Sequence, residues 1–159
     1  YQFENIMLAI CVANYFKINK KNIKRAISEY RPDNNRSQVI QTATNTVILD
    51  AYNANPSSMQ KMIESFSKIK KQNKICILGE MGELGKFSKN EHVSIIELIK
   101  KLNLSTFYIG KEFVNLKQSN SFLTVEHFIK HVEKKSIKNS TILLKGSRSV
   151  ALEKLITQL

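Results

Sequence analysis

Residues 48–58 (ILDAYNANPSS) contain side chains whose types and spacing suit ligand chemistry. Asp50 ends a short apolar run, and open α/β sheets bind ligands at the carboxyl ends of their strands. A carboxylate there can accept hydrogen bonds from a ribose, while Tyr52 offers a flat ring and Asn53 an amide for a purine edge. The same segment also fits a purely structural role, because its Asn-Pro pair is typical of a helix start.

A second junction lies at residues 143–149 (LLKGSRS), where an apolar run leads into Lys145, Ser147 and Arg148. Cationic side chains together with free N–H groups at a helix start bind phosphate or carboxylate. We therefore predict an anion pocket here, with a plain strand–turn–helix junction as the alternative. Arg36, in a polar segment further upstream, either reaches a nucleotide phosphate or is an ordinary exposed charge.

Neither junction makes a complete active site. The phosphate-loop pattern G-x-x-x-x-G-K-[ST] is missing, and the sequence contains no catalytic-triad signature and no closely spaced metal ligands, so we predict no metal site. In residues 78–92 (LGEMGELGKFSKNEH), Glu80 and Glu83 favour a solvated loop over an ammonium site. His92 is expected to be a buried hydrogen-bonding residue on an apolar helix face.

The elements that position these junctions follow from hydrophobic periodicity. Short apolar runs predict strands at 37–43, 46–50, 74–79, 106–110, 121–124 and 141–146. Apolar stripes at helical spacing predict helices around 59–69, 92–99, 125–132 and 152–159. This alternation predicts an α/β fold with a mostly parallel sheet of about six strands, covered on both faces and carrying one antiparallel edge hairpin.

The first part of the chain has a different character. Residues 4–16 are apolar on nearly every side, and a second helix is predicted at about 20–29. The polar string RPDNNR (31–36) predicts a boundary between residues 1–31, the tail of a preceding domain, and residues 32–159. Because no initiator Met precedes Tyr1, we expect a piece of a longer cytoplasmic protein. Apolar side chains of residues 1–31, such as Ile6, Ile10 and Phe16, should then be exposed or fold back on the second domain.

Composition excludes some classes of function. The net charge of +12 comes from scattered basic residues near predicted helix ends, which favours a solvated surface over nucleic-acid binding. A basic α/β nucleic-acid-binding module remains an alternative. No apolar run reaches the roughly 18–20 residues that cross a bilayer, so we predict no membrane span. Cys11 and Cys76 lie in apolar runs and are predicted to be reduced core residues.

Three strings occur in one order: D-x-Y-N-A-N-P-x-S from Asp50, L-G-E-M-x-E-L-G from Leu78 and K-G-S-R from Lys145. They resemble the C-terminal part of the Mur ligases, specifically those that add D-alanyl-D-alanine to UDP-N-acetylmuramoyl-tripeptide. Residues 2–10 are similar to the Asn-x-x-Asn helix that ends the central ATPase domain of that family, with Gln2 at the first Asn position. A sister Mur ligase or a folylpolyglutamate-type ligase is the alternative, against which YNANP and KGSR argue.

The resemblance implies an ATP-dependent, ADP-forming amide ligase of peptidoglycan precursor synthesis that works through an acyl phosphate. It also implies a Rossmann-like C-terminal domain that closes over the nucleotide. The phosphate loop and the Mg²⁺ ligands belong to the central domain of the family, so this chain alone is expected to be inactive. We further expect a cytoplasmic monomer with no nucleic-acid partner.

The resemblance also assigns residues by position. It implies a nucleotide side with Asn5 at the adenine, Asp50 at the ribose, Tyr52 and Asn53 beside them, and Arg36 at the hinge. It implies a second side, facing the incoming dipeptide or the acyl phosphate, formed by Lys145, Ser147 and Arg148.

Overall fold

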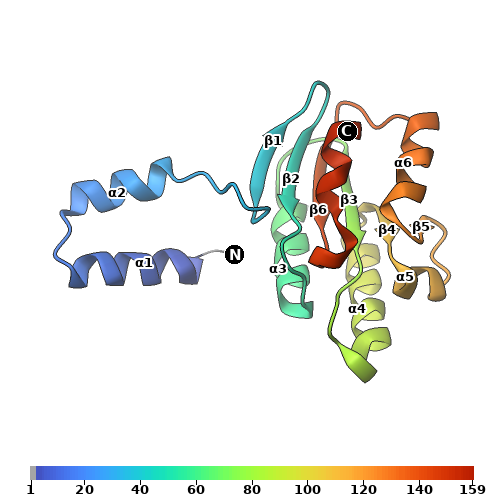
Figure 1. Ribbon diagram of the computed structural model, residues 1–159, viewed down its shortest axis with the longest axis horizontal. Helices are drawn as coiled ribbons and strands as arrows, with labels where there is room; N and C mark the ends of the chain where they lie inside the picture. The colour runs from blue at the N-terminus through green and yellow to red at the C-terminus, as the bar shows by residue number, and fades with distance from the viewer. Residues whose placement is uncertain (1–2) are drawn as a thin grey trace. The chain divides into compact units, whose positions relative to one another are not determined.

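The computed structural model describes residues 3–159 and divides into two compact units, one ending at Pro32 and one spanning Asp33–Leu159 (Figure 1). The division falls inside the polar string that predicted a boundary. The first unit is a helical hairpin of α1 (Phe3–Tyr15) and α2 (Lys20–Glu29). Asn19 caps α2, since its side chain accepts a hydrogen bond from the Lys21 N–H at 2.8 Å.

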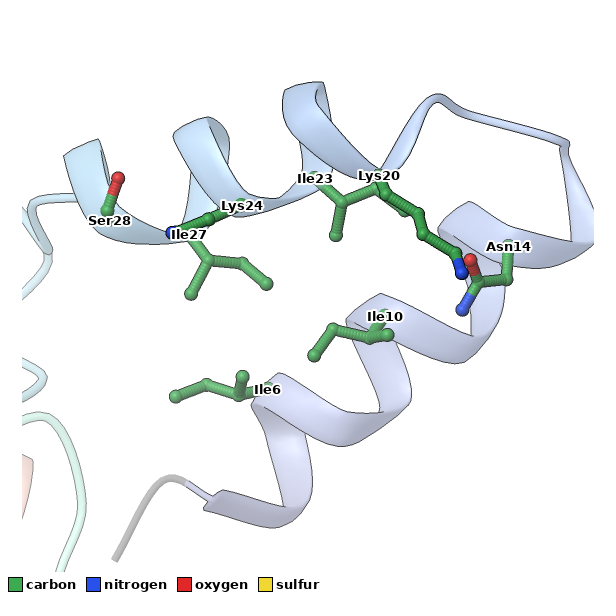
Figure 2. A pocket seen from close by; sticks show the side chains of 8 residues that line it. All are labelled: Ile6, Ile10, Asn14, Lys20, Ile23, Lys24, Ile27 and Ser28. Atoms are coloured by element: carbon green, nitrogen blue, oxygen red, sulfur yellow. The ribbon is translucent and has the colours of Figure 1, made fainter.

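The hairpin has an apolar inner groove. The groove has a volume of about 480 Å³. Figure 2 shows that Ile6 and Ile10 of α1 and Ile23 and Ile27 of α2 line it. α1 has no buried residue, and Phe16 is 68% exposed. Several apolar side chains of α1 are exposed as well, including Leu8 at 64%. Cys11 is exposed, so the prediction of a core position was wrong for it, and it was right for the buried Cys76.

The second unit is built on a six-stranded sheet of order β1-β2-β6-β3-β4-β5. The strands are β1 (Gln38–Gln41), β2 (Thr46–Asp50), β3 (Lys74–Gly79), β4 (Ser105–Ile109), β5 (Ser121–Phe122) and β6 (Thr141–Lys145). β1 pairs antiparallel with β2, and all other pairs are parallel. The mostly parallel sheet and its antiparallel edge hairpin are therefore confirmed.

Helices cover both faces of this sheet (Figure 1). α3 (Pro56–Ser67), α4 (Ser88–Lys101) and α5 (Lys111–Asn115) pack on one face, and α6 (Val125–Lys134) and the 3₁₀ helix η3 (Leu152–Gln158) pack on the other. Side chains of the central strand β6 pack on both faces of the sheet. Leu143 belongs to the core formed with α3, α4 and α5, and Leu144 belongs to the core formed with α6 and η3. All five residues of β6 are buried, as expected for a parallel strand covered on both sides.

Some local predictions were wrong. The stretch predicted as a helix at 152–159 is 3₁₀, and it follows a 3₁₀ turn η2 (Arg148–Val150) through Ala151, whose left-handed φ of 57° separates the two. The strand predicted at 37–43 ends at Gln41, because the Thr42 N–H turns to the Asn45 carbonyl at 2.9 Å. The short helix α5 was not predicted.

Candidate functional site

The carboxyl ends of three neighbouring parallel strands form the candidate site. In the sheet register Asp50 of β2 lies beside Lys145 of β6, and Lys145 lies beside Leu78 of β3. The loops after these strands therefore meet at one edge. Because β1 runs antiparallel and pairs Gln38 with Leu49, the segment before β1, which holds Arg36, reaches the same edge.

The predicted site residues of the second unit gather at this edge: Arg36, Asp50, Tyr52, Asn53, Lys145, Ser147 and Arg148. Asn5 lies in the first turns of α1, in the other unit. Gln2 lies outside the described residues.

Asp50 and Lys145 form a buried ion pair. Lys145 Nζ lies 2.6 Å from Asp50 Oδ2, and the two side chains are 1% and 4% exposed. The same Nζ lies 3.5 Å from the Asn53 carbonyl oxygen. Asp50 Oδ1 accepts a hydrogen bond from the Ser37 N–H at 2.9 Å and lies 3.4 Å from Ser37 Oγ. The resemblance assigned Asp50 and Lys145 to different ligands, whereas the structure pairs them with each other.

Two arginines meet on one aromatic ring. Arg36 Cζ lies 4.1 Å from the centroid of the Tyr52 ring, and Arg148 Cζ lies 5.5 Å from the same centroid. The Tyr52 side chain is 42% exposed, and both arginines are exposed. Within the described part of the chain neither guanidinium forms an ion pair with a carboxylate. The two guanidinium groups therefore place two positive charges close together at the surface, and this arrangement favours the binding of an anion.

Ser147 lies just below this surface and is 6% exposed. Its N–H donates to the Glu80 carbonyl oxygen at 3.0 Å, and its Oγ lies 2.8 Å from Ser149 Oγ. The sequence predicted an anion pocket lined by free N–H groups of a helix start. The structure has short 3₁₀ turns there, and the Ser147 N–H is already used.

The loop after β3 lies against the loop after β6 through two glycines. A Cβ atom at Gly146 would lie 2.7 Å from Gly79 Cα, so the backbones approach as closely as glycine allows. Glu80 Oε2 accepts a hydrogen bond from the Glu112 N–H at 3.0 Å, at the start of α5. The expectation of a solvated loop therefore holds for the exposed Glu83 and not for Glu80.

His92 secures the loop after β3. Its buried ring accepts the Met81 N–H on Nε2 at 3.0 Å and lies 2.7 Å from the Ser88 carbonyl oxygen through Nδ1. Since a carbonyl oxygen only accepts, Nδ1 carries the proton of a neutral imidazole. The ring also packs edge-on against Phe113, with centroids 4.8 Å apart. The prediction of a buried hydrogen-bonding histidine is confirmed.

Two buried side chains, Cys76 and Tyr108, have strongly raised pKa values, and both lie in the core, away from Arg36 and Arg148. Burial raises the pKa of the Cys76 thiol to about 12, and burial likewise raises the pKa of Tyr108 to about 12.

Among residues 3–159 no three His, Cys, Asp or Glu side chains gather in a way that would hold a metal ion. Every helix in that range is too short or too polar to span a bilayer.

Sequence reasoning missed Ser37 and the backbone of Glu80. Both contribute backbone groups, for which the sequence carries no signal. The Ser37 N–H donates to Asp50, and the Glu80 carbonyl oxygen accepts the Ser147 N–H. Neither residue type predicts such a contact, since it depends on the pairing of strands far apart in the chain.

The chain matches a known protein family and curated relatives. Residues 35–148 match the family described as Mur ligase, glutamate ligase domain. The UDP-N-acetylmuramoyl-tripeptide–D-alanyl-D-alanine ligase of Treponema pallidum (strain Nichols) is 31% identical over 163 residues, covering 96% of this chain and 35% of that protein. The chain thus spans about a third of the length of this curated relative.

Solved structures share the fold. The crystal structure of MurF from Acinetobacter baumannii superposes with a TM-score of 0.79 at 25% identity, covering 98% of this chain and 36% of that one. MurF ligase from Thermotoga maritima in complex with ADP gives 0.78 at 22% identity, with 99% and 37% covered. The bifunctional folylpolyglutamate synthase/dihydrofolate synthase of Yersinia pestis gives 0.59 at 13%, with 87% and 34% covered, a likeness of fold alone.

The family match covers most of the chain, and it includes the strand ends and loops that carry Arg36, the Asp50–Lys145 pair and Ser147. The six-stranded sheet has the architecture of the Mur ligase C-terminal domains among its structural neighbours. This chain belongs to the Mur ligase family.

Proposed function

We propose that this chain is part of an ADP-forming amide ligase that joins D-alanyl-D-alanine to UDP-N-acetylmuramoyl-tripeptide. The observation that carries the proposal is the convergence of Arg36 and Arg148 on Tyr52 at the carboxyl edge of the sheet. All the ligands of such a reaction are anions: the nucleotide and the acyl phosphate carry phosphates, and the dipeptide carries a carboxylate. The names of the relatives add the choice of substrates.

Arginine suits both kinds of anion, because its planar fork donates two parallel hydrogen bonds to a phosphate or a carboxylate. We propose that Arg36 binds a phosphate of the nucleotide, with Tyr52 and Asn53 beside the nucleoside. Arg148 would bind the dipeptide carboxylate or the acyl phosphate, with Ser147 below it. Asn5 would contact the adenine.

ATP supplies the phosphoryl group that turns the tripeptide carboxylate into an acyl phosphate. The residues of this edge fit the nucleotide and not a Mg²⁺ ion, because hard cations need free oxygen ligands. Asp50 is paired with Lys145, and Glu80 Oε2 accepts the Glu112 N–H. We therefore derive no step through Mg²⁺ and propose that its ligands belong to another part of the enzyme.

The remaining machinery would lie outside this chain. We propose that residues 1–31 end a central ATPase domain and that residues 32–159 form the C-terminal domain, which closes over the nucleotide and keeps water from the acyl phosphate. The chain alone would then be inactive. The complete enzyme would be a cytoplasmic monomer.

The test uses the complete ligase that carries this domain. ADP release is measured with UDP-N-acetylmuramoyl-tripeptide and Mg-ATP, offering D-alanyl-D-alanine or single amino acids. We expect release that depends on the dipeptide and falls about 10- to 100-fold in Arg36→Ala and Arg148→Ala, the range for losing a hydrogen bond to a charged group. The matched control is Lys154→Ala, which removes an exposed charge paired with Glu126 at 3.2 Å.

Each contrary result has one meaning. Release with a single amino acid would assign the domain to a sister ligase. If a folded enzyme released no ADP with any amine, the ligase proposal would be refuted and salt-dependent nucleic-acid binding would be the next measurement. Unchanged kinetics in both arginine variants would refute the proposed roles of the two arginines.

A further inference from the structure

The connections that lead from a helix back to the next parallel strand are rich in lysine. They join α3 to β3, α4 to β4 and α6 to β6. Residues 68–74 contain four lysines, residues 100–101 two and residues 134–138 three, and these segments contain no acidic residue. Along the chain the three groups look scattered, because whole strands and helices separate them.

The sheet brings the three connections side by side. β6, β3 and β4 are neighbours and run parallel, so the connections lie at the edge where these strands begin (Figure 1). Two connections are joined by hydrogen bonds, from the Thr141 N–H to the Asn73 carbonyl oxygen at 3.1 Å and from Asn73 Nδ2 to the Asn139 carbonyl oxygen at 3.2 Å. The third lies beside them, since Ile75 pairs with Ser105 in the register. We call these nine lysines the lysine edge.

The charges of the lysine edge are not neutralised within the unit. Eight of the nine side chains are exposed, and the half-buried Lys74 donates to the Ser67 carbonyl oxygen. Among residues 3–159 none of the nine forms an ion pair with a carboxylate. The C-terminus of each helix carries a partial charge of about half an electron, so three helix ends offset only a small part of nine positive charges.

A surface of this charge fits an extended anionic partner, and the residue types favour lipid over nucleic acid. Nucleic-acid sites typically combine arginine forks, which read base edges, with aromatic rings on which bases stack. In the three segments every charged residue is a lysine and no residue is aromatic. The lysine ammonium is a compact, hydrated charge on a flexible stem, and clusters of four to eight such charges attract anionic lipid headgroups.

We propose that the lysine edge docks this protein on the surface of an anionic lipid bilayer. The candidate site lies at the other ends of the same strands, so it stays open to water while the lysine edge faces the headgroups. That orientation also keeps Arg36 and Arg148 away from lipid phosphates, which would compete for them. The proposal does not rest on the proposed function, because it needs only the charge of this edge.

The test measures binding of the complete protein that carries this chain to sedimenting lipid vesicles. One set of vesicles is phosphatidylcholine alone, and in the other about a third of the lipid is phosphatidylglycerol. The edge variant is Lys70→Gln/Lys71→Gln/Lys138→Gln, which takes charges from the two connections that are hydrogen-bonded to each other. All three side chains are exposed, so the urea midpoint should not change.

The matched control removes the same charge from the opposite edge of the sheet. Lys86→Gln/Lys89→Gln/Lys111→Gln replaces three exposed lysines in the segments that follow β3 and β4. Both variants therefore have the same net charge, and they differ in where it was removed.

We expect the original protein to bind the phosphatidylglycerol vesicles at about 0.1 M salt and to be released at about 0.5 M, because exposed charges are screened. Each lysine near the headgroups contributes about fivefold to the partition coefficient, so the edge variant should bind about 100-fold more weakly. The control variant should change binding less than about threefold.

Four results would overturn the proposal. The original protein could fail to bind, or it could bind phosphatidylcholine vesicles equally well, which would assign binding to exposed apolar side chains. Equal losses in the two variants would show that net charge alone matters. Tighter binding to a DNA duplex than to vesicles at the same phosphate concentration would assign the edge to nucleic acid. A ligase that releases no ADP with any amine would refute the proposed function and leave the vesicle result standing.

Discussion

Replacing Gly146 by alanine should destabilise the second unit more than the same replacement at Gly79 or Gly82. The added Cβ would lie 2.7 Å from Gly79 Cα and 3.0 Å from Gly79 N. Both contacts are with backbone at the end of β3, which is paired to β6 by the sheet register. β3 and β6 cannot move apart without breaking the hydrogen bonds between them, because paired strands lie about 4.8 Å from each other.

The size of the effect follows from the geometry. Overpacking of a rigid site costs about 1–3 kcal/mol, and a clash of backbone with backbone belongs at the upper end. At about 3 kcal/mol and a urea m-value of about 2 kcal/mol/M, the unfolding midpoint of Gly146→Ala should fall by about 1.5 M. Ser147 follows directly in the chain, so the same variant should also raise the KM values of the complete ligase.

Gly79 and Gly82 serve as the comparison for Gly146. Gly79→Ala would bring its Cβ to 3.1 Å from Gly146 Cα and from a Val150 methyl group, which predicts an intermediate loss of about 1–2 kcal/mol. Gly82→Ala meets nothing closer than 3.8 Å and should change stability by less than about 0.5 kcal/mol. The measurement is urea unfolding of the 159-residue chain followed by circular dichroism. A Gly146→Ala midpoint equal to that of Gly82→Ala would refute the packing argument.

Three further predictions concern the core. Asn45→Ala removes a buried amide that accepts the Ser140 N–H at 3.0 Å, and it should cost about 2–3 kcal/mol in urea unfolding; an unchanged midpoint would contradict this. His92→Phe leaves the Met81 N–H without its acceptor and should cost about 1–3 kcal/mol, while His92→Gln restores an acceptor and should recover part of it; equal losses would exclude the hydrogen bond as the cause. Burial raises the pKa of Cys76 from 9.0 to about 12, so its contribution to the free energy of unfolding is complete below pH 9. That contribution is lost as pH rises toward 12, at up to about 1.4 kcal/mol per pH unit. From pH 8 to 11 the free energy of unfolding of Cys76→Ala should therefore fall less steeply with pH than that of the original chain, and identical slopes would refute the assignment.

Much of the fold was predictable because its signals are local. The strands at 46–50 and 74–79 have the predicted bounds, since continuous apolar runs of this length are typical of buried parallel strands. The start of α3 was predictable for the same reason, as Asn55 accepts the Ser58 N–H at 2.8 Å and Pro56 occupies the first turn. The ends of β1 and the 3₁₀ character of η3 were not, because they depend on individual turn geometries.

The sequence allowed us to predict which residues lie at the candidate site, but not which of them contact one another. Strand ends in an α/β fold led to Asp50, Tyr52 and Lys145 from position and residue type alone. That Asp50 and Lys145 form one buried pair follows from the β2–β6 register, which joins residues 95 positions apart. No local pattern carries that information.

The sequence by itself determined the alternation of strands and helices, the cap of α3 and the motifs that indicate a Mur ligase, because each depends on residues close together in the chain. The tertiary structure decided which of these side chains are exposed and which are buried and paired. It set Arg36 and Arg148 on one exposed ring, buried the ion pair beneath them and directed the Ser147 N–H to Glu80. The physical reason is that burial and charge pairing are properties of the assembled sheet edge, and a residue's type is the same whether it binds a ligand or holds a neighbour.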